Sequence, residues 1–160
     1  MAFKLKTMEA AVTASATALS ISNIGTRLDL LDTEFGDGII LTDIKRVYTA
    51  EVKDVPEYPS LFILGEDSVP NQTTFTHYRF KNNLTLVILA TDQDPEKLRK
   101  RLYRYVRALA ELMIESMTTN GYQIVIGQFN YSPLFTKEGE FLGDASLKIS
   151  MTKFEETSYA

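Results

Sequence analysis

The sequence predicts an α+β domain in which a mostly antiparallel β-sheet packs against one long helix in the second half of the chain and against an N-terminal helix. Two observations lead to this prediction. Residues 84–90, Leu-Thr-Leu-Val-Ile-Leu-Ala, are apolar on both faces of a strand, which indicates a central strand in a covered sheet. Residues 94–120 follow with the periodicity of an amphipathic helix. Because 160 residues, 44% of them hydrophobic, suffice for one sizeable core, we expect a single domain spanning residues 1–160.

Clear signals mark both ends of the long helix. Asp94 can accept hydrogen bonds from the free amide groups of the first turn, and Pro95 fits that turn. Asn120 and Gly121 form the matching stop signal. At 100° per residue, the apolar side chains expected to face the sheet are Leu98, Leu102, Tyr105, Val106, Leu109, Leu112 and Met113.

A further apolar flank widens this helix face. Tyr103, Ala110 and Ile114 extend the apolar arc beyond what contact with one sheet requires. Arg99 falls on the same flank, which suits an arginine at an interface. We therefore expect a second body to cover the flank, either the N-terminal helix or another subunit.

Shorter patterns predict the other elements. Apolar residues at helical spacing indicate a helix over roughly the first twenty residues, and residues 23–35 are interpreted as helical or irregular. Prolines and the pair Asn82-Asn83 separate the strand candidates, so we expect the third and fourth to form one hairpin and the last two a second hairpin. The predicted strands are residues 44–52, 60–65, 73–80, 84–90, 122–131 and 145–154.

Residues 132–144 form a long connection between the last two strands. Connections of this length in a compact domain are more often functional than idle. Leu134, Phe135, Phe141 and Leu142 would be costly to leave in water, so we interpret the segment as a protruding hairpin arm that buries them against a partner. The alternative is that the loop folds back and packs on its own domain.

Composition excludes several classes of function. The formal net charge of −4 and the pI of about 5.1 argue against a dedicated nucleic-acid binder. The absence of cysteine excludes disulfides, thiolate chemistry and cysteine-zinc sites, and it suggests a protein assembled inside a cell. No stretch approaches membrane-spanning length and the first residues lack the core of a signal peptide, so we expect no membrane association.

No residue pattern points to catalysis. His77, the only histidine, has no positioned partner nearby in sequence, so a structural or surface imidazole is favoured over a general base. An acidic stretch lacks the ladder of an EF-hand, so a solvated or subunit-facing patch is favoured over a metal site. That stretch consists of Asp29, Asp32, Glu34, Asp37 and Asp43. The glycine spacings fit neither a phosphate loop nor a dinucleotide fingerprint, and we expect no enzyme activity, cofactor or metal.

Three parts of the chain follow one another in a characteristic order. They are the strand that begins Tyr58-Pro59 and runs to Glu66, the strand-Asp-Pro-helix unit of residues 84–120, and the closing hairpin of residues 122–154. Preceded by an amphipathic helix, this layout resembles the tail terminator family of tailed bacteriophages. The resemblance implies a ring-forming α+β virion subunit, usually a hexamer, which is assembled in the host cytoplasm, caps the completed tail tube and joins it to the head connector. The implied partners are further copies of the chain, the tail tube protein and the connector protein, with DNA only passing through the ring lumen; no catalytic residues come with it.

Opposite charge clusters suggest how such a ring would assemble. The outer face of the long helix carries a basic stripe, which is most simply a solvated face, with docking to an acidic neighbour next and nucleic acid last. In a head-to-tail ring, the acidic patch from Asp29 to Asp37 of one copy would meet the basic stripe from Lys97 to Arg107 of the next. The charged residues assigned to the interface are Arg99, Lys100, Arg104, Arg107, Asp32, Glu34 and Asp37.

The second interpretation is a small α+β module that binds a ligand or regulates another protein. A pocket with convergent polar groups between sheet and helix would favour it. Mass in solution separates the two, because a ring is many times 18.1 kDa whereas such a module is typically monomeric or dimeric.

Overall fold

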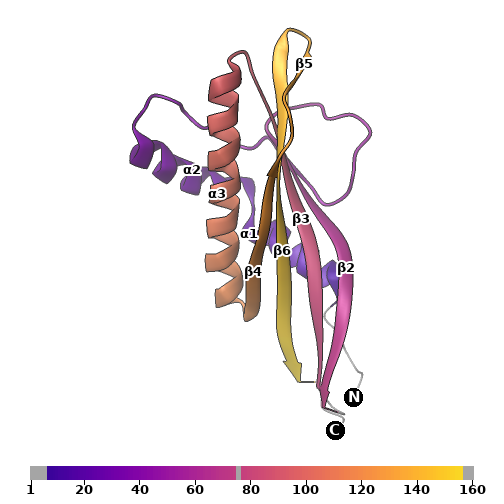
Figure 1. Cartoon of the computed structure of the whole chain (residues 1–160). Helices are drawn as coiled ribbons and strands as arrows, with labels where there is room; N and C mark the ends of the chain where they lie inside the picture. The colour runs from indigo at the N-terminus through magenta and orange to yellow at the C-terminus, as the bar shows by residue number, and fades with distance from the viewer. Residues whose placement is uncertain (1–6, 75–76, 157–160) are drawn as a thin grey trace.

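A computed structural model describes residues 7–74 and 77–156, with the side chains of residues 71–78 and 154–156 left out, and it confirms the predicted α+β class. The fold has three helices and a mostly antiparallel six-stranded sheet of order β1-β2-β3-β6-β4, in which β5 pairs with the start of β6 (Figure 1). The first and third helices pack on the sheet, and the second packs on the third. The helices are α1 (Met8–Ala18), α2 (Ile21–Phe35) and α3 (Pro95–Thr119). The strands are β1 (Arg46–Tyr48), β2 (Ser60–Thr74), β3 (His77–Asp92), β4 (Tyr122–Tyr131), β5 (Phe135–Lys137) and β6 (Glu140–Glu156).

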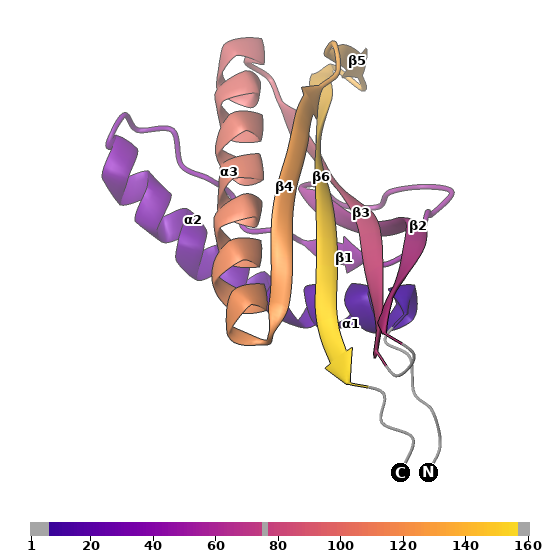
Figure 2. The ribbon, with the colours of Figure 1, turned by 60° about the horizontal axis from the view of Figure 1, so that its bottom comes forward.

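The strand β3 lies at the centre of the sheet, as its apolar sequence predicts, but the described helices cover only one of its faces. Leu84, Leu86 and Ile88 point toward the helices and are buried. Val87 and Leu89 point to the opposite face and are half-buried. The helices pack on the first face and on one another (Figure 2). The prediction of a sheet covered on both faces is therefore wrong for the described residues, because the described helices pack on one face and on one another.

The first hairpin is longer than predicted and turns elsewhere. β2 pairs with β3 from Ser60 to Thr74, so Asn82-Asn83 lies in the middle of a strand. Asn82 is buried and accepts a hydrogen bond from the Ser68 hydroxyl at 2.6 Å. Asn83 donates to Asp67 at 2.9 Å and accepts from the Ser150 hydroxyl at 2.6 Å. Because partners on neighbouring strands satisfy both amides, sheet pairing overrides the turn preference of asparagine.

The segment before β2 contains less strand and more helix than predicted. Of residues 44–52, only the three residues of β1 form a strand, which runs parallel to the start of β2. Residues 23–35 are helical throughout and belong to α2. The Ser20 hydroxyl caps this helix by accepting a hydrogen bond from the Asn23 amide at 3.2 Å. Gly36 ends it in the left-handed conformation, with φ of 56°.

The long helix and the closing hairpin match the prediction. Asp94 accepts hydrogen bonds from the amides of Glu96 at 2.9 Å and Lys97 at 3.4 Å, and Pro95 occupies the first turn. β4 and β6 pair antiparallel, as expected for the last two strands. Every predicted core residue of α3 is buried: Leu98, Leu102, Tyr105, Val106, Leu109, Leu112 and Met113.

Candidate functional site

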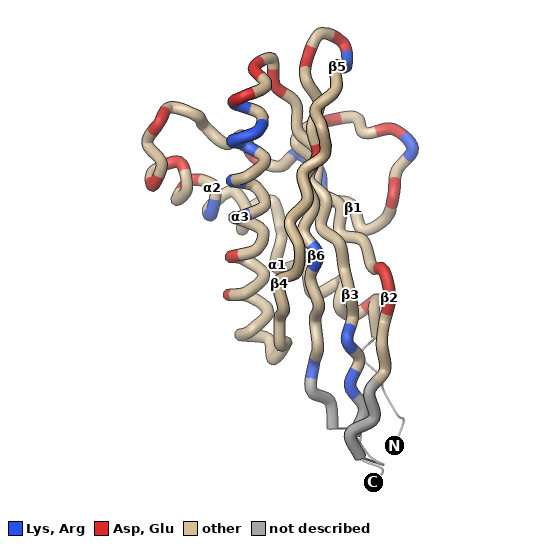
Figure 3. The backbone as a smooth tube through the Cα atoms, in the orientation of Figure 1, with Lys and Arg blue, Asp and Glu red and all other residues tan. Residues whose placement is uncertain are grey.

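The acidic and basic clusters meet within one chain. Arg107 of α3 forms a two-armed ion pair with Glu34 near the end of α2, at N–O distances of 2.6 and 3.0 Å. Arg104, one turn earlier, pairs with Asp37 in the loop after α2, and its Nη1 lies 3.1 Å from Oδ1. The basic residues of α3 gather in its first half (Figure 3). The predicted contact between these groups on neighbouring subunits is therefore replaced by a clamp inside the domain that fastens α2 to α3.

The clamp places one arginine in a largely buried position. Arg104 is 7% exposed, and its guanidinium carbon lies 3.9 Å from the centre of the Phe35 ring, a favourable cation–π arrangement. The hydrogen bond from Arg104 lowers the pKa of Asp37 to about 2. A hydrogen bond from Arg107 likewise lowers the pKa of Glu34. Both carboxylates therefore stay ionised across the range in which cells operate.

The remaining charged candidates also have local roles or stand near the surface. Lys100 pairs with Glu96 one turn away on α3, at 3.2 Å. Asp32 accepts a hydrogen bond from the backbone amide of Leu41 at 3.0 Å, which holds the loop after α2. Arg99 is half-buried at the surface of α3. The structure thus does not bring the predicted acidic and basic residues to one outward-facing patch.

We expect Asp37→Asn to destabilise the domain near neutral pH and to lose that effect in acid. Because folding lowers the pKa of Asp37 from 3.8 to about 2, its ionised form stabilises the fold above the unfolded-state pKa. That contribution is lost as pH falls through the folded-state value. Urea unfolding midpoints of the wild type and the variant, compared at about pH 7, 4 and 2, measure the loss. Asp29→Asn, at an exposed position of α2, is the matched control; an Asp37→Asn effect that persists unchanged at the lowest pH would contradict the clamp.

The predicted arm is a short hairpin of β5 and the start of β6 that projects past the N-terminal end of α3 (Figure 1). Leu142 is buried, at 6% exposed, and Leu134 and Phe141 pack against the core. Leu134 occupies the space beside Gly143, where an added Cβ would lie 2.5 Å from its Cδ2. Phe135 alone of the four predicted residues remains exposed, at 54%. The alternative, in which the loop packs on its own domain, therefore describes Leu134, Phe141 and Leu142.

The strand β4 forms one margin of the sheet and contains no charged residue. Its Val125, Phe129 and Tyr131 are 55%, 40% and 36% exposed. Beside it on α3, Tyr103 and Ile114 are also exposed, and the Tyr103 ring packs edge to face on Tyr131 with centres 4.9 Å apart. Val125 lies on the face of the sheet turned away from α3, where it lines a depression with Lys148 and Ser150. We call the other four residues the apolar margin.

The apolar margin was only partly visible in the sequence. The helical flank predicted Tyr103 and Ile114 as residues in need of a cover, and the structure shows that the N-terminal helix does not bury them. The contribution of β4 was missed. Its signal is a ten-residue strand without a single charge, which is unusual for a strand at the edge of a sheet.

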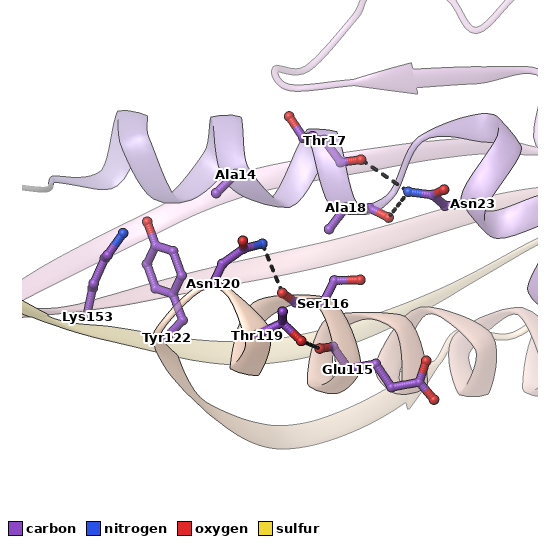
Figure 4. A pocket seen from close by; sticks show the side chains of 10 residues that line it. All are labelled: Ala14, Thr17, Ala18, Asn23, Glu115, Ser116, Thr119, Asn120, Tyr122 and Lys153. Carbon is purple, nitrogen blue, oxygen red and sulfur yellow. Dashed lines mark hydrogen bonds between the residues drawn. The ribbon is translucent and has the colours of Figure 1, made fainter.

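A groove of about 670 Å³ opens between the ends of α1 and α3 (Figure 4). Several of its polar side chains are already engaged by the backbone of their own helix. Asn120 donates to the Ser116 carbonyl at 2.9 Å, and the Thr119 hydroxyl also bonds a carbonyl of α3. The Lys153 ammonium lies 5.1 Å from the centre of the Tyr122 ring. The groove has room for a ligand, but these groups do not converge on one point.

The described side chains offer no obvious metal centre and no helical membrane anchor. Across them, no three carboxylate or imidazole groups come together in a way that could hold a metal ion. Among the described helices, none combines the length and the apolar character that crossing a membrane requires. The backbone of His77 lies in β3, but its side chain lies outside the described part, so its predicted role stays a prediction.

Comparison with known proteins found no family model that matches the chain and no curated protein that matches it significantly.

Proposed function

We propose that this chain is a structural subunit of a tailed-phage virion that assembles into a ring, caps the tail tube and joins it to the head connector. The observation that carries the proposal is the apolar margin. An uncharged edge strand flanked by exposed aromatic and aliphatic side chains is typical of a surface that another protein covers. The kind of assembly comes from the resemblance of the sequence layout to tail terminators.

The shape of the domain supports contacts in two directions. The apolar margin runs along one side of the sheet, where a neighbour in the same ring would pack. The β5–β6 hairpin projects beyond α3 at one end, and the long β2–β3 hairpin projects at the other (Figure 1). Phe135, in the first of these hairpins, is 54% exposed, and we expect it to contact an adjoining ring of tube or connector protein.

The mass of the purified full chain in solution tests the proposal. We expect a single species many times heavier than 18.1 kDa and closed rings in electron micrographs. Phe129→Glu, which puts a charge into the apolar margin, should reduce the species to a monomer because burying an unpaired carboxylate is costly. Leu30→Glu is the matched control, since Leu30 is an exposed apolar residue of α2 away from the margin. A wild-type protein that stays monomeric, alone and with tail tubes, would overturn the proposal.

The groove between α1 and α3 favours a second candidate, a small ligand-binding or regulatory module. Its volume of about 670 Å³ suits a small molecule. The same experiment separates the two candidates. A monomer whose unfolding temperature rises with a small ligand would favour the binding module, whereas rings would favour the virion subunit.

A further inference from the structure

We propose that the free edge of β4 pairs with the free edge of β2 in the neighbouring copy, so that one continuous sheet runs around the assembly. The inference rests on the proposed self-association and names the strands that form the joint. It follows from three features of the two edges: the charges they carry, the directions of their strands and the level at which they bend.

The edge of β4 lacks the features that usually keep edge strands from pairing. Natural edge strands are shortened, charged or interrupted by proline, because unpaired backbone groups otherwise recruit another strand. β4 has ten residues, none charged and none proline. In the part of the chain that the structure describes, no strand pairs with its outer side. A partner for this edge must therefore supply an extended strand.

The opposite side of the same sheet offers such a strand. β1 pairs only with residues Ser60, Leu61 and Phe62 of β2, so beyond them the described residues leave the outer side of β2 open. Two carboxylates lie on this stretch, but both are turned across the sheet. Glu66 accepts a hydrogen bond from Thr85, and Asp67 accepts one from Asn83 at 2.9 Å. The outer edge of β2 is therefore less charged than its sequence suggests, and Val69 on it is 48% exposed. Pro70 has no amide hydrogen to donate, so the joint lies on the stretch of β2 between the residues that pair with β1 and this proline.

The two edges run in compatible directions. Each of the pairs β2–β3, β3–β6 and β6–β4 is antiparallel, so β2 and β4 of one chain run in opposite directions on opposite sides of the sheet (Figure 2). A neighbour rotated about an axis along the strands brings its β2 beside β4 in the antiparallel sense. Such a joint needs no change of direction in either strand.

Both edges also bend at the same level of the sheet. The register of β4 shifts just after Ile126, which is level with Ile149, Leu84 and Gly65 across the sheet. The register of β2 shifts between Gly65 and Asp67. Because a bulge bends its strand, two edges that bend together follow a common curve, as strands in a closed sheet must.

Pairing β4 with β2 also accounts for both edges at once. If two copies joined β4 to β4 around a two-fold axis, the β2 edges of both would remain open. Head-to-tail joining uses one edge of each kind in every contact, and closure of the ring leaves neither β4 nor the open stretch of β2 without a partner.

Chemical cross-linking of engineered thiols tests the joint, since the natural chain has no cysteine. The full chain with both Val125→Cys and Val69→Cys is treated with a short bifunctional maleimide. The cross-linker must span less than roughly 14 Å, which is the three strand spacings between β2 and β4 of one chain. It then cannot join the two thiols of the same chain. We expect a ladder of covalent oligomers that ends at the size of the ring. Val69→Cys with Leu30→Cys is the matched control and should give no ladder.

The outcomes separate this inference from the proposed function. An equal mixture of the two single variants should give covalent dimers, and Val125→Cys alone should give none. Dimers from Val125→Cys alone would show β4-to-β4 pairing and overturn the inference. Multimers in solution without a ladder would contradict the pairing of β4 with β2 but would leave the proposed ring unaffected. A monomer at every concentration tested would overturn both.

Discussion

Leu109→Ala is expected to lower the free energy of unfolding by about 2–5 kcal/mol, because it removes buried methyl groups and leaves a cavity. Leu109 lies on the face of α3 that packs against the sheet and is 1% exposed. Ile114→Ala is the matched control on the same helix. Since Ile114 is 47% exposed, its truncation should change monomer stability by no more than about 0.5 kcal/mol.

Urea unfolding followed by circular dichroism measures the free energy of unfolding of both variants. Because self-association adds to that free energy, the variants are compared at the same protein concentration. Equal losses for Leu109→Ala and Ile114→Ala would contradict the orientation of α3. The pair also separates folding from assembly, because Ile114 belongs to the apolar margin. We expect Ile114→Ala to weaken self-association while leaving the monomer intact.

The second large effect is expected at the β5–β6 hairpin, where two apolar residues of the predicted arm should respond in opposite ways. Leu142→Ala should cost about 2–5 kcal/mol of unfolding free energy, because Leu142 is buried in its own domain at 6% exposed. Phe135→Ala should leave that free energy within about 0.5 kcal/mol, because the ring is largely exposed. Under the proposed function it should instead reduce the completion of tails, since exposed aromatics are frequent anchors of interfaces.

Unfolding curves and a count of completed tails in a complementation experiment distinguish these roles. A destabilising Phe135→Ala, or a neutral Leu142→Ala, would contradict the observed packing of the hairpin. Normal tail completion by Phe135→Ala would remove this residue from the set that meets an adjoining ring.

The ion pairs between α3 and the end of α2 show what the sequence leaves open about charged residues. The basic stripe of α3 and the acids near the end of α2 are visible in the sequence, but their mutual distance is not. Ile24, Leu28 and Leu31 bury one face of α2 and thereby set its approach to α3. Once that packing exists, Glu34 and Asp37 lie within ion-pair distance of Arg107 and Arg104. A contact that sequence reasoning assigned to two subunits thus becomes internal.

One part of the apolar margin could be predicted from the sequence and the other could not. The exposed flank of α3 was predicted from helical periodicity, because that signal depends only on the angle between successive side chains. The margin formed by β4 was not predicted, because the order of strands in a sheet is set by pairing between distant segments. Which strand ends at the edge is therefore not encoded in the pattern of that strand alone.

The sequence by itself determined the features whose physics is local. These are the α+β class, the start and end of α3 with its capping Asp94, the buried face of that helix, and the pairing of β4 with β6. Tertiary structure decided where Asn82 and Asn83 lie, which face of the sheet stays uncovered, and which charges pair. Local choices follow from capping, periodicity and backbone propensity, which act over a few residues. The other choices depend on hydrogen bonds and packing between segments far apart in the chain, whose energies outweigh local preference only after the fold has brought those segments together.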